Sequence, residues 1–452
     1  MPAAPAKWPS VTIQLPLYNE PNVAARIVDA AAALRYDGAL DIQVLDDSND
    51  ATPAIVAGRV AFHRARGIHI AHIRRPSRDG FKAGALAHGM SLSDADLFAV
   101  FDADFVPSTD FLSRTVPHFA GGRVGMVQAR WTHLNAAESL LTRVQAIFLD
   151  AHFAVESAAR HFSARFFNFN GTAGVWRREA IAEAGGWSAS TLTEDLDLSY
   201  RAQLAGWQFV FLPDVEVAAE LPSALSGFQE QQHRWAKGSI QTARKLLPAI
   251  GRSSEPRRVK SEAFFHLTNN AAYLLTTIVA LLIVPAIVIR QRAGVRWTFA
   301  FDALLFVLST TSVLLFYTEG QRWANQRRPR LRELMAVLPV GIGLSLRNSV
   351  AVLEGLFEHG GEFHRTPKRG SAGALPRDRT PRMPWGELIL TLFFVTAAAA
   401  FVSARQWLSL PFLLLFLGGY LFVAVHAVSE RIHALRATMR VACSARTSAR
   451  CS

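Results

Sequence analysis

Residues 97–105 read LFAVFDADF, an apolar stretch that ends at two carboxylates. The length and composition of Leu97–Phe101 are typical of a buried β-strand. Asp102 and Asp104 would then stand together at the carboxyl end of that strand, separated by one small residue. A strand followed at once by acidic side chains favours a fold in which ligands bind at the ends of parallel strands.

The same arrangement occurs twice nearer the N-terminus. The apolar run Val11–Leu17 ends at YNEPN, and Asp41–Leu45 stops at Asp46. Between them, Ala24–Leu34 has a helical pattern. Alternating strands and helices predict an α/β unit built on a mostly parallel sheet, with its ligand groups at the carboxyl ends of the strands.

The chain has 452 residues, enough for two units, and its charge indicates where they divide. Residues 1–250 carry 23 Lys and Arg against 25 Asp and Glu, whereas residues 251–452 carry 25 against 11. In the second part the cations occupy short segments between apolar runs, which is typical of the inner side of a membrane and not of a nucleic-acid-binding surface. We expect a cytosolic domain over residues 1–250, a membrane domain over residues 251–452, and no nucleic-acid partner.

Two further features favour a cytosolic first domain. The only cysteines, Cys443 and Cys451, are too few and too badly placed for a disulfide framework or a structural zinc site. The residues before Val11 contain no apolar run, so we expect no signal peptide.

Four apolar segments approach the roughly 20 residues that cross a bilayer. They are Phe264–Ile289, Trp297–Tyr317, Leu388–Ala404 and Leu408–Val428.

A fifth apolar segment, residues 331–357, contains Pro339, Arg347 and Glu354. If it crossed the membrane, the basic loop at residues 358–382 would lie outside, against the positive-inside bias. We therefore predict an amphipathic helix, or a broken pair of helices, in the cytoplasmic interface.

The Asp102 and Asp104 carboxylates can converge on a divalent cation and on a diphosphate that the cation bridges. Mg²⁺ or Mn²⁺ would be the fitting ion, because both prefer hard oxygen ligands. Taken alone, the motif is better explained as a solvated turn.

Two further clusters follow the same logic. Asp46 and Asp47, in VLDDSND, either form an ordinary turn or accept hydrogen bonds from a nucleotide base or ribose. Arg78 and Lys82, in SRDGFKAGAL, either belong to a solvated basic loop or bind phosphate at the start of a helix.

Residues 193–195 read TED and precede a helical pattern, so Glu194 and Asp195 either cap a helix or supply a general base. Residues 231–235 read QQHRW. Arg234 is suited to neutralising a leaving diphosphate and Trp235 to packing on a sugar ring, although surface packing also explains such a pair. We interpret His233 as a structural hydrogen-bonding residue, because no Cys or His partner has metal spacing.

These clusters belong to a longer ordered series, which is LPLYNE, VLDDSND, RDGFKAGAL, FDADF, FNGTAGVWR, TEDLDLSYRAQLAGW and ELPSALSGFQEQQHRW. The series resembles the processive members of glycosyltransferase family 2, most closely the plant cellulose synthase-like A and C group and its bacterial relatives. The resemblance covers about residues 10–250.

The resemblance implies a GT-A catalytic domain that performs an inverting transfer onto the growing end of a β-linked polysaccharide, which is threaded through the membrane helices. It implies that Asp47 contacts the nucleotide, that Asp102 and Asp104 bind the metal and diphosphate, and that Asp195 is the base. Gln231, Arg234 and Trp235 would hold the acceptor and the diphosphate. The complete candidate set is Asp195, Glu194 and Asp104 as catalytic residues and Asp46, Asp47, Arg78, Lys82, Asp102, Gln231, Arg234 and Trp235 as substrate-binding residues.

The segment EFHRTPKRG, residues 362–370, resembles the loop that closes over the nucleotide in such synthases. One departure is that family members usually carry a transmembrane helix before the catalytic domain, whereas this chain begins almost at its first strand. The helix is absent, lost through a misassigned start site, or supplied by a partner. A membrane partner protein and a homo-oligomer are the two candidate assemblies.

The leading hypothesis is a multi-pass enzyme of the inner (plasma) membrane that polymerises a β-mannan, glucomannan or β-glucan from GDP-mannose or UDP-glucose, with its catalytic domain in the cytoplasm. Two alternatives remain. One is transfer of a single sugar to a lipid carrier, and the other is a non-catalytic membrane protein that binds a glycan or nucleotide.

Overall fold

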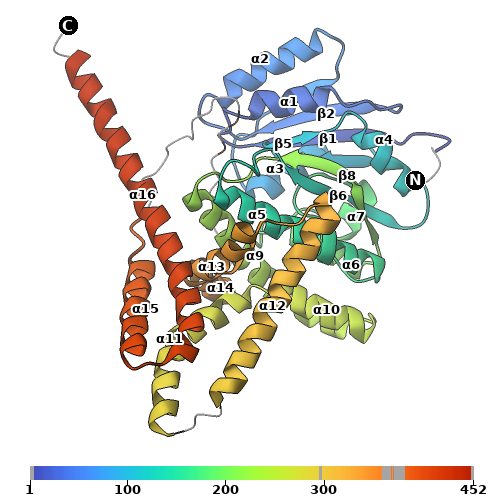
Figure 1. The fold of residues 1–452 in the computed structure, drawn as a ribbon. Helices are drawn as coiled ribbons and strands as arrows, with labels where there is room; N and C mark the ends of the chain where they lie inside the picture. The colour runs from blue at the N-terminus through green and yellow to red at the C-terminus, as the bar shows by residue number, and fades with distance from the viewer. Residues whose placement is uncertain (1–4, 295–297, 359–367, 369, 371–381, 449–452) are drawn as a thin grey trace.

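The computed structural model describes residues 5–294, 298–358, 368, 370 and 382–448. It consists of a sheet covered by helices, from which a group of long helices extends (Figure 1). The N-terminal half forms the sheet layer, and the elements described after residue 224 are helices.

A single eight-stranded sheet forms the centre of the N-terminal half, in the order β3-β2-β1-β4-β7-β6-β8-β5. Strands β1 to β4 pair in parallel and β6 pairs in parallel with β8, whereas β7 and β5 are antiparallel to their neighbours. The strands are β1 (Val11–Leu17), β2 (Leu40–Asp46), β3 (Ile70–Ile73), β4 (Leu97–Val100), β5 (Phe105–Pro107), β6 (Val124–His133), β7 (Gly174–Arg177) and β8 (Gln208–Ala219).

The first strands of the sheet are buried on both faces. Ile13 and Leu15 of β1 are fully buried, and all four residues of β4 are buried. Central strands of a parallel sheet are covered by helices on both sides, so even the polar Thr12 and Gln14 of β1 are buried. The predicted strands and the α/β class are confirmed.

Helices cover both faces of this sheet and frame its strand ends. Two hydrophobic clusters pack against opposite faces, one around α1 and one around Trp176 and Phe209. The elements are α1 (Ala24–Ala32), α2 (Thr52–Arg64), α3 (Phe81–Ser91), α4 (Phe111–Thr115), the 3₁₀ turn η1 (Val116–Phe119), α5 (Leu140–Ala151), the π-helical turn η2 (His152–Ser157), α6 (Ala158–Phe162), α7 (Arg178–Glu183) and α8 (Glu194–Leu204).

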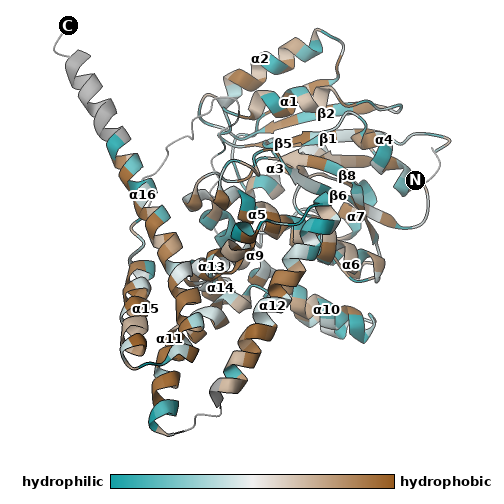
Figure 2. Cartoon of the chain, viewed as in Figure 1, coloured by the Kyte–Doolittle hydropathy of each residue, from teal (hydrophilic) through white to brown (hydrophobic). Residues whose placement is uncertain are grey.

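The helices after the sheet include four that are long and apolar enough to cross a membrane, namely residues 271–292, 300–325, 385–403 and 407–436. In Figure 2 the ribbons of these helices are coloured mostly as hydrophobic residues. The elements are α9 (Leu225–Arg252), α10 (Arg257–Thr268), α11 (Ala271–Arg292), α12 (Thr298–Asn325), α13 (Leu331–Gly343), α14 (Ser345–Phe357), α15 (Trp385–Ser403), the 3₁₀ turn η4 (Trp407–Ser409) and α16 (Leu410–Ser448).

The first predicted span, Phe264–Ile289, is wrong at its start. The chain breaks between α10 and α11, and the span begins at Ala271. Tertiary packing explains the difference, because Ala263 and Leu267 of α10 are buried in a cluster with α8 and α9, and the Tyr200 hydroxyl lies 2.7 Å from His266 Nδ1.

Residues 331–357 form the broken pair that the sequence offered as one option. Helices α13 and α14 meet at an angle of 45°, and together they are apolar enough to count as one bent span or a re-entrant segment. Leu344 lies at the bend.

A carboxylate of the last helix caps α9. The residue before α9, Ala224, has no side chain that can accept a hydrogen bond, yet the first amides of a helix need acceptors. Glu430 of α16 supplies them, because its carboxylate oxygens accept from the backbone N–H groups of Leu225 at 2.5 Å and Ser226 at 3.1 Å. The N-terminus of α9 is thereby attached to the last helix.

Candidate active site

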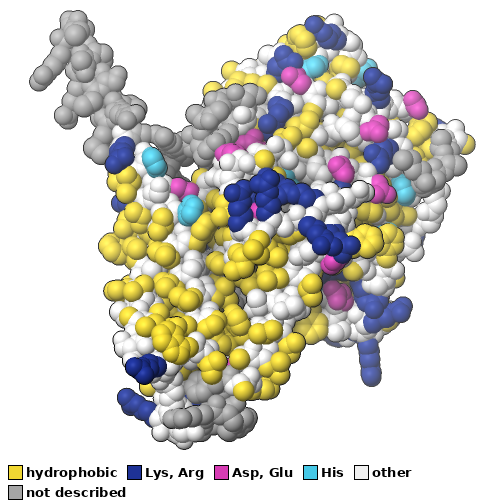
Figure 3. All heavy atoms as spheres, viewed as in Figure 1, with side chains coloured by type: hydrophobic (Ala, Val, Ile, Leu, Met, Phe, Trp, Pro, Cys, Tyr) yellow, Lys and Arg dark blue, Asp and Glu magenta, His cyan; other side chains and the backbone are white. Residues whose placement is uncertain are grey.

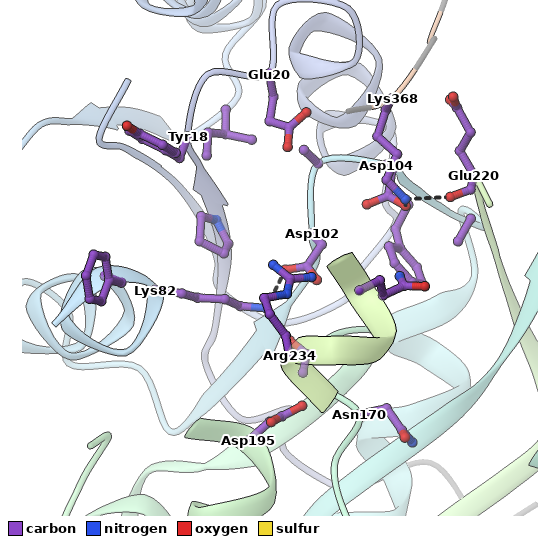
Figure 4. A pocket seen from close by; sticks show the side chains of 18 of the residues that line it. Tyr18, Glu20, Lys82, Asp102, Asp104, Asn170, Asp195, Glu220, Arg234 and Lys368 are labelled. Atoms are coloured by element: carbon purple, nitrogen blue, oxygen red, sulfur yellow. Dashed lines mark hydrogen bonds and ion pairs between the residues drawn. The ribbon is translucent and has the colours of Figure 1, made fainter. Parts of the chain in front are cut away.

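A cavity opens at the carboxyl ends of β1, β2, β4, β6 and β8. Ten of the eleven candidate residues from the sequence line it, and the exception is Asp46. Figure 4 shows carboxylates and cationic side chains from several elements around the same space. The ten are Asp47, Arg78, Lys82, Asp102, Asp104, Glu194, Asp195, Gln231, Arg234 and Trp235.

Asp46 has a supporting position instead of the substrate-binding one predicted for it. Its side chain is fully buried, its Oδ2 lies 2.8 Å from His72 Nε2, and its Oδ1 accepts a hydrogen bond from the backbone N–H of Ser48. These bonds fix the turn after β2 and leave Asp47, the next residue, on the cavity wall.

Asp47 is held by an arginine that the sequence interpretation missed. The guanidinium of Arg75 donates to both Asp47 oxygens, at 2.5 Å and 3.1 Å, and also to the backbone oxygens of Asp79 and Phe81. Nearby, the Arg78 guanidinium stacks 3.3 Å from the centre of the Tyr18 ring. The planar Arg78 and Tyr18 groups can stack on a nucleotide base, and the fixed Asp47 carboxylate can accept hydrogen bonds from it.

The acidic pair after β4 is neutralised by two lysines. Lys82 Nζ lies 2.5 Å from Asp102 Oδ1, and Lys368 Nζ lies 2.8 Å from Asp104 Oδ2. Burial lowers the pKa of Lys82, but the surrounding carboxylates outweigh it and hold that pKa above its ordinary value. Both aspartates therefore already bind a cationic group.

This donor set fits a divalent cation. No cluster of three or more His, Cys, Asp or Glu side chains suited to a metal is found among the described residues, so the chain offers Asp102 and Asp104 as a pair. A pair of carboxylates is the usual protein contribution to an Mg²⁺ that also binds substrate phosphates. The ammonium groups beside both carboxylates show that positive charge is stabilised at this position.

Glu194 and Asp195 stand at the N-terminus of α8 and face the same cavity. Burial and the neighbouring Glu194 raise the pKa of Asp195 to about 7, against the opposing charge of Lys82. Burial also raises the pKa of Glu194. A carboxylate with a pKa near neutrality is suited to accept a proton during catalysis.

A glycine allows the chain to pass directly beside this carboxylate. Gly171 has a φ of +83°, and a Cβ atom there would lie 2.8 Å from Asp195 Oδ2. Its backbone oxygen accepts a hydrogen bond from Lys82 Nζ at 2.8 Å. The glycine thus connects the lysine of the acidic pair with the proposed base.

Helix α9 contacts the cavity with one face and helix α14 with another. Gln231, Arg234 and Trp235 line the cavity, and Gly238 lets the helix approach Thr193, since a Cβ there would lie 2.5 Å from Thr193 Cγ2. On another face His233 Nε2 lies 3.5 Å from Glu354 of α14. This contact agrees with a structural role for His233.

Sequence interpretation missed further cavity residues, which are Tyr18, Trp131, His133, Glu220 and Lys368. Trp131 and His133 are two residues apart at the end of β6, so the alternation of a strand places them on one face. From this spacing the sequence could have indicated that both residues face the cavity. Most of the predicted loop at residues 358–382 lies outside the described residues, but Lys368 is described and lies in the cavity.

Comparisons with known proteins identify the family of the chain. The profile of the family described as "Glycosyltransferase like family 2" matches residues 9–238, which is half of the chain. This chain belongs to glycosyltransferase family 2. It is a hexosyltransferase of that family, as the motif series predicted.

Two rice proteins are among its similar family 2 relatives. The probable glucomannan 4-beta-mannosyltransferase 9 of Oryza sativa subsp. japonica is 37% identical over 409 residues, which cover 86% of this chain and 75% of that protein. Glucomannan 4-beta-mannosyltransferase 1 of the same organism is 42% identical over 290 residues, covering 62% of this chain and 56% of that protein.

The fold has a counterpart among solved structures. A mannosyltransferase from Pyrobaculum calidifontis, in complex with GDP-mannose and Mn²⁺, superposes with a TM-score of 0.54 at 20% identity, covering 79% of this chain and 90% of that one. The GT-A class predicted from the motif series is confirmed.

Proposed function

We propose that this family 2 enzyme polymerises a β-linked mannan or glucomannan from GDP-mannose, with UDP-glucose as a second donor, and passes the product across the membrane. The observation that carries the proposal is the single cavity that joins Asp47, the Asp102–Asp104 pair, Asp195 and Trp235. The relatives named as glucomannan 4-beta-mannosyltransferases support mannose as the transferred sugar.

The reaction follows from the positions of these groups. The acceptor hydroxyl attacks the anomeric carbon of the donor sugar while Asp195 takes the hydroxyl proton. The bond from that carbon to the diphosphate oxygen breaks, and the nucleoside diphosphate leaves with the electron pair. Attack opposite the leaving group inverts the anomeric centre.

Cationic side chains stabilise the leaving group in this scheme. Arg234 and Lys82 line the cavity beside Asp102, where negative charge develops on the diphosphate. A divalent cation bound by Asp102 and Asp104 would supply Lewis-acid stabilisation of the same charge. Trp235 would pack on the acceptor sugar.

A polymer assay tests this proposal. Membranes that contain the protein are incubated with labelled GDP-mannose, UDP-glucose and other nucleotide sugars, and the products are digested with linkage-specific glycanases. We expect GDP-mannose to give a long product that a β-mannanase degrades. A product of one sugar on a lipid would contradict polymerisation, and no incorporation from any hexose donor would contradict the proposed function.

We also propose a topology in which α11, α12, α15 and α16 cross the membrane and the bent α13–α14 pair does not. Two contacts support this. Asn325, before the pair, donates to Asp150 of α5, and Lys368, after the pair, bonds Asp104, so both flanks of the pair return to the sheet layer. In Figure 3, hydrophobic side chains cover most of the lower part of the visible face, and Lys and Arg gather above them.

Cysteine labelling tests the topology. In a variant whose native cysteines are replaced, Ala293→Cys, between α11 and α12, should react with an impermeant reagent added outside intact cells. Leu375→Cys should react only after the membrane is opened, because the proposed topology places the catalytic domain and this loop in the cytoplasm. External labelling of Leu375→Cys would show instead that the bent pair crosses.

A further inference from the structure

A buried carboxylate joins the cavity to the candidate span α12. Asp150, near the end of α5, is only 2% exposed. Its Oδ2 accepts hydrogen bonds from Gln321 Nε2 at 2.5 Å and from Asn325 Nδ2 at 2.8 Å, both on α12, and its Oδ1 lies 3.1 Å from His133 Nε2. Close packing surrounds the junction, since a Cβ on Gly320 would lie 2.6 Å from Ala151 Cα.

His133 contacts Asp150 through Nε2, which leaves its other ring nitrogen, Nδ1, outside this junction. The contact with a carboxylate assigns a proton to Nε2, so the neutral ring carries an acceptor at Nδ1. Within the part of the chain that the structure describes, Nδ1 has no hydrogen-bond partner. The side chain is 6% exposed, and the residue lines the cavity.

The surroundings of His133 differ from the charged end of the cavity. Trp131, Leu149, Leu221 and Pro222 line the same cavity, and His133 pairs with Ala219 at the end of β8. Apolar and indole surfaces with a single fixed acceptor suit a sugar ring, whose C–H face packs on aromatic rings while its hydroxyls donate hydrogen bonds. A diphosphate would instead need the cationic groups found near Asp102.

We propose that His133 is an acceptor-binding residue, whose Nδ1 accepts a hydrogen bond from a hydroxyl of the terminal acceptor sugar. Asp150 is its positioning residue, and Gln321 and Asn325 of α12 hold Asp150. The inference rests on the proposed function, because it takes the acceptor to be a β-linked glycan. It assigns to a membrane helix an indirect part in placing the acceptor.

Two matched substitutions test the role of His133. His133→Phe keeps a ring and removes the acceptor, whereas His133→Gln keeps an oxygen acceptor. We expect His133→Phe to raise the KM for soluble β-mannan oligosaccharides by about three- to tenfold, as the loss of one hydrogen bond predicts, with the KM for GDP-mannose unchanged. His133→Gln should recover part of this loss. His118→Phe, a half-buried histidine outside the cavity lining, is the control.

Direct binding separates this inference from the proposed function. Oligosaccharide binding to the purified full-length protein, measured by calorimetry, should weaken by the same factor in His133→Phe and not in His118→Phe. Wild-type protein that binds oligosaccharide but transfers no sugar would refute the proposed function and leave the inference standing. Equal oligosaccharide affinity of wild type and His133→Phe, or a change confined to GDP-mannose, would refute the inference, as would a wild type that binds no oligosaccharide.

Discussion

Asp195→Asn should reduce kcat by about 10²- to 10⁴-fold, the usual cost of removing a general base, while leaving the KM for the donor nearly unchanged. The asparagine keeps the shape of the side chain but cannot take the proton of the attacking hydroxyl. Asp195 Oδ1 accepts from the backbone N–H of Leu196 at 2.8 Å, and the amide oxygen can keep that bond. The variant should therefore fold and bind substrate, which donor-binding measurements on equal amounts of protein will check.

Glu194→Gln is the matched control for this experiment. Glu194 is adjacent, also faces the cavity and also has a raised pKa, so a purely electrostatic effect would make both variants fail alike. We expect the Glu194 variant to be much the milder. A dead Glu194→Gln with an active Asp195→Asn would transfer the role of base to Glu194.

The same residue determines the expected pH profile. Because burial and Glu194 raise the pKa of Asp195 to about 7, the carboxylate form increases as the pH rises through that value. The value of kcat/KM should rise with pH up to about 7 and then level off, since the ionised form is the base. A flat profile from pH 5 to pH 8 would contradict this assignment.

Removal of the divalent cation should abolish transfer, and Asp104→Ala should lower kcat/KM by about 10³-fold, because a bound cation contributes several kcal/mol of charge stabilisation. The measurement is transfer from GDP-mannose after chelation, followed by titration with Mg²⁺ or Mn²⁺. Asp94→Ala, an exposed aspartate just before β4, is the control and should behave as wild type. Full transfer in excess chelator would exclude a metal role for Asp102 and Asp104.

The sequence predicted the sheet and the acidic residues at its strand ends because both depend on local pattern. An unbroken apolar run such as Leu97–Val100 is stable as a strand buried on both faces, and polar residues that follow such a run reach the same edge of the sheet. Asp47 and Asp102 are far apart in the chain and still line one cavity for this reason.

Contacts between distant elements were not predictable in the same way. Phe264 continues an apolar run, but burial of the other face of α10 against α8 and α9 ends the helix before the membrane span begins. The approach of Lys368 to Asp104 joins residues 264 positions apart, and no spacing rule indicates it. His133 reads as an ordinary strand residue until Asp150 is placed beside it.

The cap that Glu430 places on α9 has a consequence for biosynthesis. Ribosomes synthesise the sheet and α9 long before residue 430, so the first amides of α9 lack this acceptor while the helices between α9 and α16 are still being synthesised. The helix that carries Arg234 and Trp235 receives its N-terminal cap only when Glu430 of α16 has been synthesised. The first turn of this helix thus completes its hydrogen bonds only after the chain has been synthesised through residue 430.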